Sequence, residues 1–340
     1  MIAKKKIILF GGCGFVGTNI YESLSKNFKI TIVDNFFKKE SKKNYIYLKS
    51  KFTNLDFKNI DVRDYDKVHK VISEVSPFFI VILSGQVSMN YSLINPIEDL
   101  NINLNGTLNI LEAYSKCKQK QKNIIFTSSN KVYGTLDQIK LKKYKLRYIN
   151  STRIKLNENL NVDLKTPYGC SKGCAEIYIK EFSRLHNIKY FILRHSSIYG
   201  NYQNSNINQG WFTWFLNEYK LAKNKKNIDF KLETFGNGFQ VRDLLHVDDL
   251  TKLYYEIIKK HKSIYNETMN IGGGYKNSSS INELISKLNS TTNLDPKIIR
   301  NKERYLDQKY FISDNSKCYK LYNWRPQKSY KKFIDSFFKN

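Results

Sequence analysis

The chain has 340 residues, enough for one large domain or two closely joined ones, and 41% of them are hydrophobic, as in ordinary globular proteins. No run approaches the roughly 18 consecutive apolar residues of a membrane span, which argues against a membrane-embedded protein and a membrane partner. The formal net charge of +27 comes from lysines scattered along the whole chain, so no nucleic-acid partner is expected.

Cysteine use and the N-terminal segment bear on the compartment. The five cysteines, at positions 13, 117, 170, 174 and 318, lack the paired spacing that is typical of zinc sites. We therefore expect plain thiols, a reducing compartment and no metal. Gly11 and Gly12 interrupt the first apolar stretch before the core of a signal peptide can form. Together these features predict a cytoplasmic protein.

A strand, a glycine turn and a helix follow one another near the N-terminus. Residues 6–10 form a short apolar run, and apolar residues recur with helical spacing over residues 15–26. Glycines let the backbone approach a pyrophosphate, and a helix N-terminus supplies free N–H groups and a favourable dipole. The candidate cofactor-binding residues in this turn are Gly11, Gly14, Phe15, Val16 and Gly17.

A carboxylate marks the end of the second predicted strand. Residues 30–33 are strand-like, and Asp34 follows them about twenty residues after the glycine turn begins. A carboxylate there binds the ribose hydroxyls of NAD and repels the 2′-phosphate of NADP, so the predicted cofactor is NAD, with Asn35 as a further contact. Lys38 and Lys39 weaken this preference, but in so lysine-rich a chain we expect both to be solvated.

A phenol and an ammonium group lie four residues apart, at Tyr168 and Lys172. If the segment is helical, both side chains share one face. The pKa of a free tyrosine is about 10, and a cation that favours the phenolate would make Tyr168 a usable base near neutral pH. Taken alone, such a pair also occurs by chance on many solvated helices.

The spacing of Gly11, Gly14 and Gly17, joined to a downstream Tyr-x-x-x-Lys, resembles the short-chain dehydrogenase/reductase superfamily and its extended branch of NAD-dependent epimerases and dehydratases. The resemblance implies a catalytic hydroxyl at Ser129 and a structural asparagine at Asn103, which we count with the catalytic residues. It also implies further cofactor contacts, at Asp61, Val62, Leu83, Ser84, Gly85, Tyr168, Lys172 and His195. We interpret the histidine as a packed, hydrogen-bonded side chain rather than as a second acid.

The alternation of strands and helices over residues 4–197 predicts an α/β fold with a doubly wound parallel sheet, the Rossmann arrangement, whose ligands lie at the carboxyl ends of the strands. We assign residues 1–198 to this NAD-binding domain, to which residues 243–272 return. Residues 199–242 and 273–340 are assigned to a smaller C-terminal substrate-binding domain. The polar, lysine-rich segment 135–165 is interpreted as a surface insertion, either part of a lid or a plain loop.

The resemblance extends to substrate-binding positions. Extended members of the superfamily usually modify nucleotide-diphosphate sugars, and residues 236–243 resemble their phosphate-binding segment, in which Arg242 would contact the diphosphate. Residues 304–309 resemble a second such segment, in which Arg304 would hold phosphate and Asp307 the ribose. A guanidinium suits this task because its donors form a planar fork. Closer matches to the CDP-paratose 2-epimerase (CDP-tyvelose epimerase) family add Gln86, Ser88, Asn130, Ser197 and Gln209 as substrate contacts.

The chain departs from these patterns at two positions. Phe10 replaces the polar residue that the superfamily often has before its first glycine. Lys309 stands where the epimerase family tends to have arginine, and lysine is not a geometric replacement for a bidentate guanidinium. The second departure could alter the recognition of phosphate or nucleotide.

The residues after Ser129 bear on the reaction. Sugar-nucleotide 4,6-dehydratases of this branch carry an Asp-Glu pair there, whereas this chain has Asn130 and Lys131, so dehydration is poorly supported. The resemblance implies inversion of C2 of a CDP-deoxyhexose, from CDP-paratose to CDP-tyvelose, by transient oxidation with bound NAD. In that reaction Tyr168 takes the hydroxyl proton, Lys172 lowers the pKa of that tyrosine, and the serine hydrogen-bonds the reacting oxygen.

Two other functions stay open. One is a UDP-sugar 4-epimerase, which would use the same hydride chemistry at another carbon. The other is a non-catalytic NAD-binding or nucleic-acid-binding protein, against which the joint presence of Ser129, Tyr168 and Lys172 argues. Residues 97–117 and 168–186 resemble helices that form a subunit bundle in this superfamily, so a homodimer or homotetramer is expected.

Overall fold

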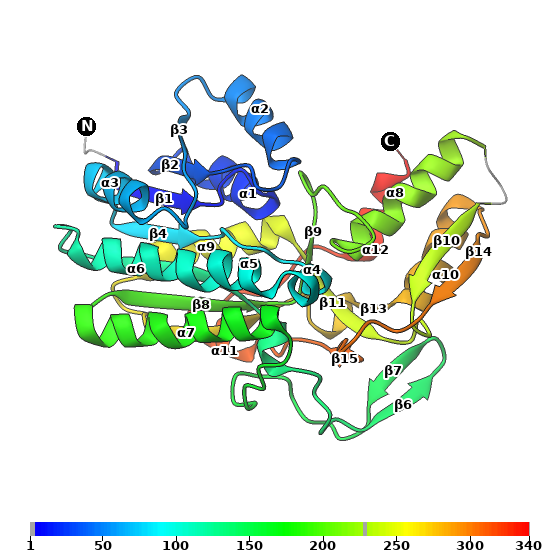
Figure 1. Cartoon of the computed structure of the whole chain (residues 1–340). Coiled ribbons are helices and arrows are strands. Elements are labelled where there is room, and N and C mark those ends of the chain that lie inside the picture. The colour runs from blue at the N-terminus through cyan, green and yellow to red at the C-terminus, as the bar shows by residue number, and fades with distance from the viewer. Residues whose placement is uncertain (1–3, 227–229, 340) are drawn as a thin grey trace.

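A computed structural model describes residues 4–226 and 230–339, and its largest element is a seven-stranded parallel sheet in the order β12-β8-β5-β4-β1-β2-β3 (Figure 1). The strands are β1 (Lys6–Phe10), β2 (Lys29–Asp34), β3 (Asp56–Asn59), β4 (Phe79–Ile82), β5 (Asn123–Ser129), β8 (Lys189–His195) and β12 (Glu267–Ile271). The central strands β1 and β4 are nearly continuous apolar runs because both of their faces are covered.

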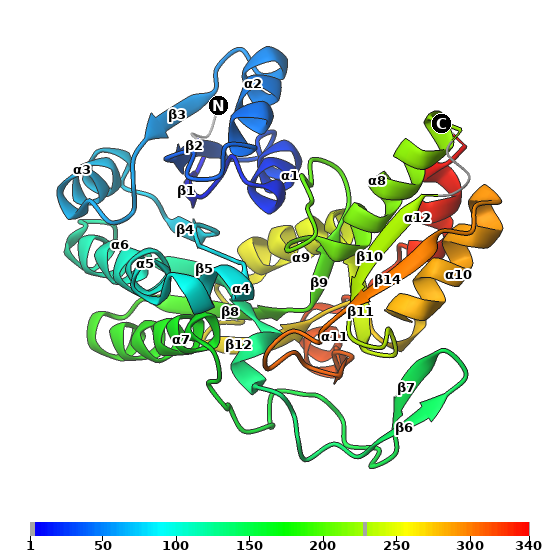
Figure 2. The ribbon, with the colours of Figure 1, turned by 45° about the vertical axis from the view of Figure 1, so that its right-hand side comes forward.

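Helices cover both faces of this sheet (Figure 2). On one face lie α3 (Tyr65–Val75), α6 (Gly106–Lys116) and α7 (Pro167–His186). On the other lie α1 (Phe15–Leu24), α2 (Ser41–Lys51), α9 (Val247–Lys260) and α11 (Ser316–Tyr322). The predicted α/β fold with a doubly wound sheet is therefore confirmed. Among the helices of the described residues, none is both long enough and apolar enough to cross a bilayer.

Short helical elements connect β4 to α6. They are α4 (Met89–Ile94), α5 (Pro96–Leu100) and a π-helical turn, η1 (Asn101–Asn105). Such turns are rare and often occur at functional sites, because the extra residue redirects the side chains that follow. Here the turn aims Asn103 at α7, where its Nδ2 lies 3.2 Å from the hydroxyl of Ser171.

A second part of the molecule has its own core. Its strands are β9 (Ser197–Tyr199), β11 (Val241–His246), β13 (Ser278–Ser280) and β15 (Tyr310–Phe311) in one sheet, with β10 (Lys231–Phe235) and β14 (Lys297–Asn301) as a separate parallel pair. The helices α8 (Trp211–Asn224), α10 (Ile281–Thr292) and α12 (Tyr330–Phe337) pack around buried side chains such as Tyr219, Leu244 and Leu288. The short 3₁₀ turn η3 (Tyr275–Asn277) precedes β13.

The chain passes between the two parts more than once. After β11, helix α9 returns to the main sheet and packs beside α1, and β12 forms an edge of that sheet. The helix begins at Val247 with two acidic residues in its first turn, as the sequence predicts. Strand β11 spans the boundary that we place at residue 243, so the domain limits stay a prediction.

The insertion at residues 135–165 is more ordered than we expected. Strands β6 (Leu141–Tyr144) and β7 (Arg147–Asn150) form an antiparallel hairpin, at the lower right of Figure 1. The backbone N–H of Tyr148 donates to the carbonyl of Phe239 at 2.9 Å, and the guanidinium of Arg147 donates to the hydroxyl of Ser278 at 2.6 Å. These contacts dock the hairpin on the second part, and no local pattern in the lysine-rich segment encodes them.

Candidate active site

The glycine turn after β1 forms a tight backbone cradle. Gly11 has a φ of +79°, and a Cβ there would lie 2.5 Å from the backbone nitrogen of Ser84 at the end of β4. A Cβ at Gly17 would lie 2.6 Å from the Cα of Gly12, so α1 can pack this closely only without side chains. Helix α1 begins at Phe15 without a capping side chain from the described residues, which leaves its first N–H groups facing the turn.

Asp34 stands at the end of β2 beside this cradle. Its two carboxylate oxygens accept the backbone N–H groups of Cys13 at 3.0 Å and Phe36 at 2.9 Å. Burial raises the pKa of Asp34, and these hydrogen bonds oppose the rise. The carboxylate is therefore held in one orientation at the place where the sequence predicts a ribose contact.

Lys38 is not solvated, as we had expected. It is half-buried, and its Nζ donates to Oε1 of Gln209 at 2.9 Å, while Lys39 is exposed as predicted. Burial lowers the pKa of Lys38 to about 8. The contact joins the loop after β2 to the segment that precedes α8, and both residues line the cavity beside the glycine turn.

A cavity of about 220 Å³ opens on the glycine turn. All the cofactor-binding residues predicted in the turn and near the ends of β2, β3 and β4 line it, namely Gly11, Gly14, Phe15, Val16, Gly17, Asp34, Asn35, Asp61, Val62, Leu83, Ser84 and Gly85. These features fit NAD: a backbone cradle that a Cβ would fill, a helix N-terminus and a carboxylate at the end of β2, where the sequence predicts a ribose contact.

Helix α7 presents Tyr168 and Lys172 from its first turns. A proline occupies the first helical position, and the hydroxyl of Thr166 caps the helix by accepting the N–H of Gly169 at 3.2 Å. Both side chains, together with Ser129 at the end of β5, line a second cavity of about 400 Å³. The two cavities adjoin, since the residues that line both are Phe15, Val16, Leu83, Val87 and Gln209.

Burial is the main influence on the protonation of Tyr168 and Lys172. Burial raises the pKa of Tyr168 to about 12, the hydrogen bond with Ser129 lowers it, and the charge of Asp99 raises it. Burial also lowers the pKa of Lys172 to about 8, against the charges of Asp99 and Glu176. Burial is the largest influence on both groups, so the lowering of the pKa of Tyr168 by Lys172 stays a prediction. The Lys172 ammonium lies 4.5 Å from the ring centre of Phe126.

Behind Lys172 lies a buried carboxylate that we did not predict, Asp99. Its Oδ1 accepts from Nε2 of Gln86 at 2.7 Å and from Nδ2 of Asn103 at 3.1 Å, and its Oδ2 accepts from the hydroxyl of Ser171 at 2.6 Å. Burial raises the pKa of Asp99, and the hydrogen bonds from Ser171 and Gln86 oppose the rise. The four-residue spacing of Asp99 and Asn103 was the signal that could have found it.

Two predicted substrate contacts, Gln86 and Ser88, lie behind the cavity wall. Gln86 is 3% exposed and faces the Asp99 carboxylate, and the hydroxyl of Ser88 caps α4 by accepting the N–H of Tyr91 at 3.3 Å. Neither lines the cavity, because neighbours in an extended segment alternate in direction. Asn103 likewise supports the wall instead of facing the cavity. The residues of this segment that do line it are Val87, Met89 and Asn90.

His195, at the end of β8, is packed as expected. Its Nδ1 lies 3.4 Å from the carbonyl of Ser128, and its ring stacks on Tyr254. Burial lowers the pKa of His195 to about 4, so the ring is neutral and its Nδ1 is the donor to that carbonyl. Among the described residues Nε2 has no partner, although the side chain lines the larger cavity. An orphaned acceptor beside the junction of the two cavities fits an amide donor of the cofactor.

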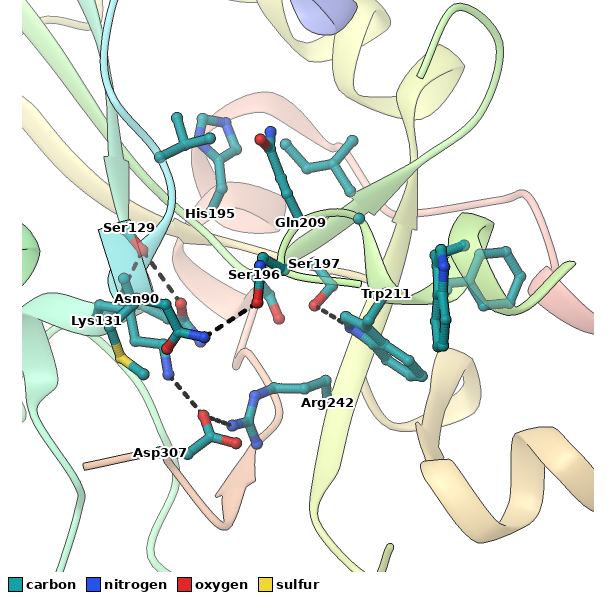
Figure 3. Close-up of a pocket in the computed structure, with 18 of the residues that line it drawn as sticks. Asn90, Ser129, Lys131, His195, Ser196, Ser197, Gln209, Trp211, Arg242 and Asp307 are labelled. Carbon is teal, nitrogen blue, oxygen red and sulfur yellow. Dashed lines mark hydrogen bonds and ion pairs between the residues drawn. The ribbon is translucent and has the colours of Figure 1, made fainter. Parts of the chain in front are cut away.

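Charged side chains gather around Asp307 in the larger cavity (Figure 3). Oδ1 of Asp307 lies 2.9 Å from the guanidinium of Arg242 and 3.0 Å from Nζ of Lys131. The guanidinium of Arg304 lies 4.2 Å from the ring centre of Phe235. Burial opposes ionisation of Asp307, but the charges of Lys131 and Arg242 outweigh it and hold its pKa below its usual range. The structure thus brings the predicted Arg242, Arg304 and Asp307 together.

The remaining predicted substrate contacts, Asn130, Ser197 and Gln209, also line this cavity. Nδ2 of Asn130 donates to Oε1 of Gln308 at 3.0 Å, and the hydroxyl of Ser197 accepts from Nε1 of Trp211 at 3.1 Å (Figure 3). The aromatic wall beside them was not predicted residue by residue. It comprises Trp211, Phe212, Trp214 and Phe215 of α8.

The family model described as the NAD dependent epimerase/dehydratase family matches residues 7–272 of the chain. The chain belongs to this NAD-dependent epimerase/dehydratase family. Membership confirms the resemblance seen in the sequence, NAD as the cofactor and the expectation that the protein is an enzyme, an epimerase.

Curated relatives of this family member span nearly its whole length. It is 35% identical over 335 residues to CDP-paratose 2-epimerase of Salmonella typhi, with 98% of each chain covered. It is 31% identical over 323 residues to a putative UDP-glucose 4-epimerase of Methanocaldococcus jannaschii, with 94% of this chain and 93% of the relative covered.

Solved structures of other epimerases share the fold. A UDP-glucose 4-epimerase from Thermotoga maritima with UDP-glucose superposes with a TM-score of 0.79 at 24% identity, covering 98% of both chains. A UDP-glucuronic acid 4-epimerase from Bacillus cereus in complex with UDP-glucuronic acid and NAD has a TM-score of 0.81 at 22% identity, again over 98% of both chains. At this identity the likeness supports the fold alone.

Proposed function

We propose that this family member is a nucleotide-sugar 2-epimerase that inverts C2 of a CDP-deoxyhexose, converting CDP-paratose to CDP-tyvelose. The observation that carries the proposal is one cavity that is lined both by Tyr168 and Ser129 and by Arg242 and Arg304, and that adjoins the cavity that fits NAD. The 35% identity to a CDP-paratose 2-epimerase over 98% of both chains favours C2 and a cytidine nucleotide.

The substrate chemistry requires an oxidation that is later reversed. The C2 hydrogen of such a sugar has no neighbouring carbonyl that would acidify it, so its removal as a proton is unfavourable. NAD⁺, when bound, supplies a positively charged ring that accepts a hydride from C2 and later returns it. Because oxidation and reduction cancel, no net redox change results and the cofactor can stay bound between turnovers.

Three side chains of this protein serve the proton transfer: one binds the reacting oxygen, one accepts the proton and one supplies a positive charge. The hydroxyl of Ser129 hydrogen-bonds the reacting oxygen, and the phenolate oxygen of Tyr168 takes the hydroxyl proton as the C2–O bond becomes a carbonyl. The ketone then presents its other face, and the same proton returns to its oxygen. Burial holds the pKa of Tyr168 high, so its ionised form needs a positive charge close by. Asp99 and Glu176 favour the charged form of Lys172, which provides it.

Replacing Tyr168 with phenylalanine tests this mechanism. The variant should lose turnover by about a hundredfold or more, since it has no proton acceptor, while NAD remains bound. The measurement is product formation from CDP-, UDP- and GDP-sugars, with bound NAD quantified by absorbance after denaturation. Tyr178→Phe is the matched control, because Tyr178 lies on the same helix and is 44% exposed. If Tyr168→Phe epimerises the substrate as fast as the unaltered protein does, the mechanism is wrong.

A UDP-sugar 4-epimerase is the second candidate. The 31% identity to a putative UDP-glucose 4-epimerase favours it, and the catalytic side chains would act in the same way. NMR of the product distinguishes the two, since the coupling constants of the ring protons show which carbon is inverted. Inversion of C4 alone would decide for the second candidate.

A further inference from the structure

Lys131 is a cation inside the substrate cavity whose role the proposed reaction leaves open. Its side chain is 19% exposed, it lines the cavity, and its Nζ lies 3.0 Å from Oδ1 of Asp307. Burial lowers the pKa of Lys131, and the charge of Asp307 opposes this. A desolvated ammonium in a ligand cavity is costly unless a partner compensates it, and a bound anion would add a second partner.

The backbone ties Lys131 to the catalytic hydroxyl. It belongs to the short 3₁₀ turn η2 (Asn130–Tyr133), and its own N–H donates to the hydroxyl of Ser129 at 3.2 Å. On the other side, Asp307 joins it to Arg242, which lies 2.9 Å from the same carboxylate oxygen. A continuous path of contacts therefore runs from Ser129 through Lys131 and Asp307 to Arg242 (Figure 3).

The charges at this end of the cavity suit a diphosphate. Three cations, Lys131, Arg242 and Arg304, surround the single carboxylate of Asp307. The other acidic side chain here, Glu233, is exposed and accepts from Asn301 at 3.2 Å. The excess positive charge in a partly desolvated site favours an anion with two charged groups.

The position of Lys131 distinguishes between the carbons of the sugar. In a nucleotide sugar the β-phosphate is bonded through oxygen to C1, which neighbours C2, whereas C4 lies across the ring. The backbone N–H of Lys131 donates to the hydroxyl of Ser129, and its Nζ reaches Asp307, so its cation lies one lysine side chain away from the catalytic hydroxyl. That placement suits a substrate whose phosphate lies next to its reacting carbon. We propose that Lys131 binds the β-phosphate and so places C2, and not C4, at Ser129 and Tyr168. This inference rests on the proposed function.

Nucleotide binding by the NAD-loaded protein tests the phosphate contact without turnover. The probes are CDP against CMP, and UDP against UMP, because only the diphosphates carry a β-phosphate. In the unaltered protein the diphosphate should bind more tightly than the monophosphate. In Lys131→Met that advantage should fall about tenfold or more, while affinity for the monophosphate stays within about twofold.

Two further variants keep the test decisive. Lys131→Arg retains the charge and should keep most of the diphosphate advantage even if the methionine variant folds poorly. Lys140→Met, an exposed lysine outside the cavity, should leave both affinities unchanged. Suppose that the unaltered protein inverts C2 and that Lys131→Met binds the diphosphate as much more tightly than the monophosphate as the unaltered protein does. That result would overturn this inference and leave the proposed function standing. Inversion of C4 by the unaltered protein would overturn the placement of C2 together with the proposed function.

Discussion

Asp99 influences the charge of Tyr168 and Lys172, the proposed catalytic residues, without lining the cavity. It is fully buried, and its carboxylate is held by side chains from three segments, those of Gln86, Asn103 and Ser171. Its charge raises the pKa of Lys172 and also raises that of Tyr168. It therefore favours the ammonium that the phenolate needs and at the same time opposes the phenolate itself.

Replacing Asp99 with asparagine should shift the pH optimum of turnover downward by about one unit. Removing the negative charge lowers the pKa of Tyr168 and also that of Lys172, because Asp99 raises both. Both limbs of the pH profile therefore move to lower pH. The measurement is kcat as a function of pH.

Glu98→Gln is the control for this shift. Glu98 neighbours Asp99 on α5 but lies near Arg63, at 3.8 Å, outside the Asp99 network. Its replacement should leave the optimum where it is. A profile of Asp99→Asn that keeps the original optimum, or moves upward, would contradict the assigned charge balance.

Among the secondary-structure elements, α7 depends on its anchorage to β8. A buried ion pair joins them, with the guanidinium of Arg194 2.6 Å from the carboxylate of Glu176 and both side chains no more than 5% exposed. The same guanidinium donates to the hydroxyl of Tyr133 at 2.8 Å, which in turn donates to Asn270 of β12 at 2.8 Å. This network holds the helix that carries Tyr168 against the carboxyl ends of the strands.

Glu176→Gln should lower the free energy of unfolding by about 3 kcal/mol, because the buried guanidinium of Arg194 loses its counter-charge. The measurement is the urea midpoint of the NAD-loaded protein. Glu181→Gln removes an exposed ion pair with Arg184 on the same helix, and it should change the stability by less than about 1 kcal/mol. Equal midpoints for the two variants would show that the buried pair does not anchor the helix.

Across the whole molecule, one surface of α5 and α7 carries exposed apolar side chains. The two helices lie side by side (Figure 1), and the exposed fractions are 69% for Ile97, 61% for Ile177 and 56% for Leu185. Large exposed apolar groups that gather on neighbouring helices are costly in water and typical of interfaces. The surface supports the predicted homodimer, which stays a prediction.

Ile177→Lys should convert the predicted dimer to a monomer, because it places a charge from each subunit among the exposed apolar side chains of the predicted interface. Sedimentation velocity at micromolar concentration measures the change. Leu221→Lys is the control, because the Leu221 side chain is 53% exposed and lies on α8 in the second part of the molecule. It should leave the assembly unchanged. A monomeric unaltered protein, or a dimer that tolerates Ile177→Lys, would remove the basis for placing the interface here.

The fold and the cofactor could be predicted because their signals are local. Apolar runs predicted the strands β1 and β2 to within one residue, and the glycine turn leads directly into α1. A carboxylate at a strand end, such as Asp34, is placed by the strand itself. The carboxyl ends of parallel strands meet at one edge of a sheet, so the motifs that follow them necessarily lie near one another.

Tertiary structure alone decided which polar side chains face the substrate. Lys131 contacts Asp307 across 176 residues of sequence, and Asp99 contacts Ser171 across 72. Side-chain direction also decided that Gln86 turns into the wall. Such contacts depend on how elements pack and on which side of an extended segment a residue lies. Desolvation raises the pKa of Tyr168, and it exists only once the chain has folded around that side chain.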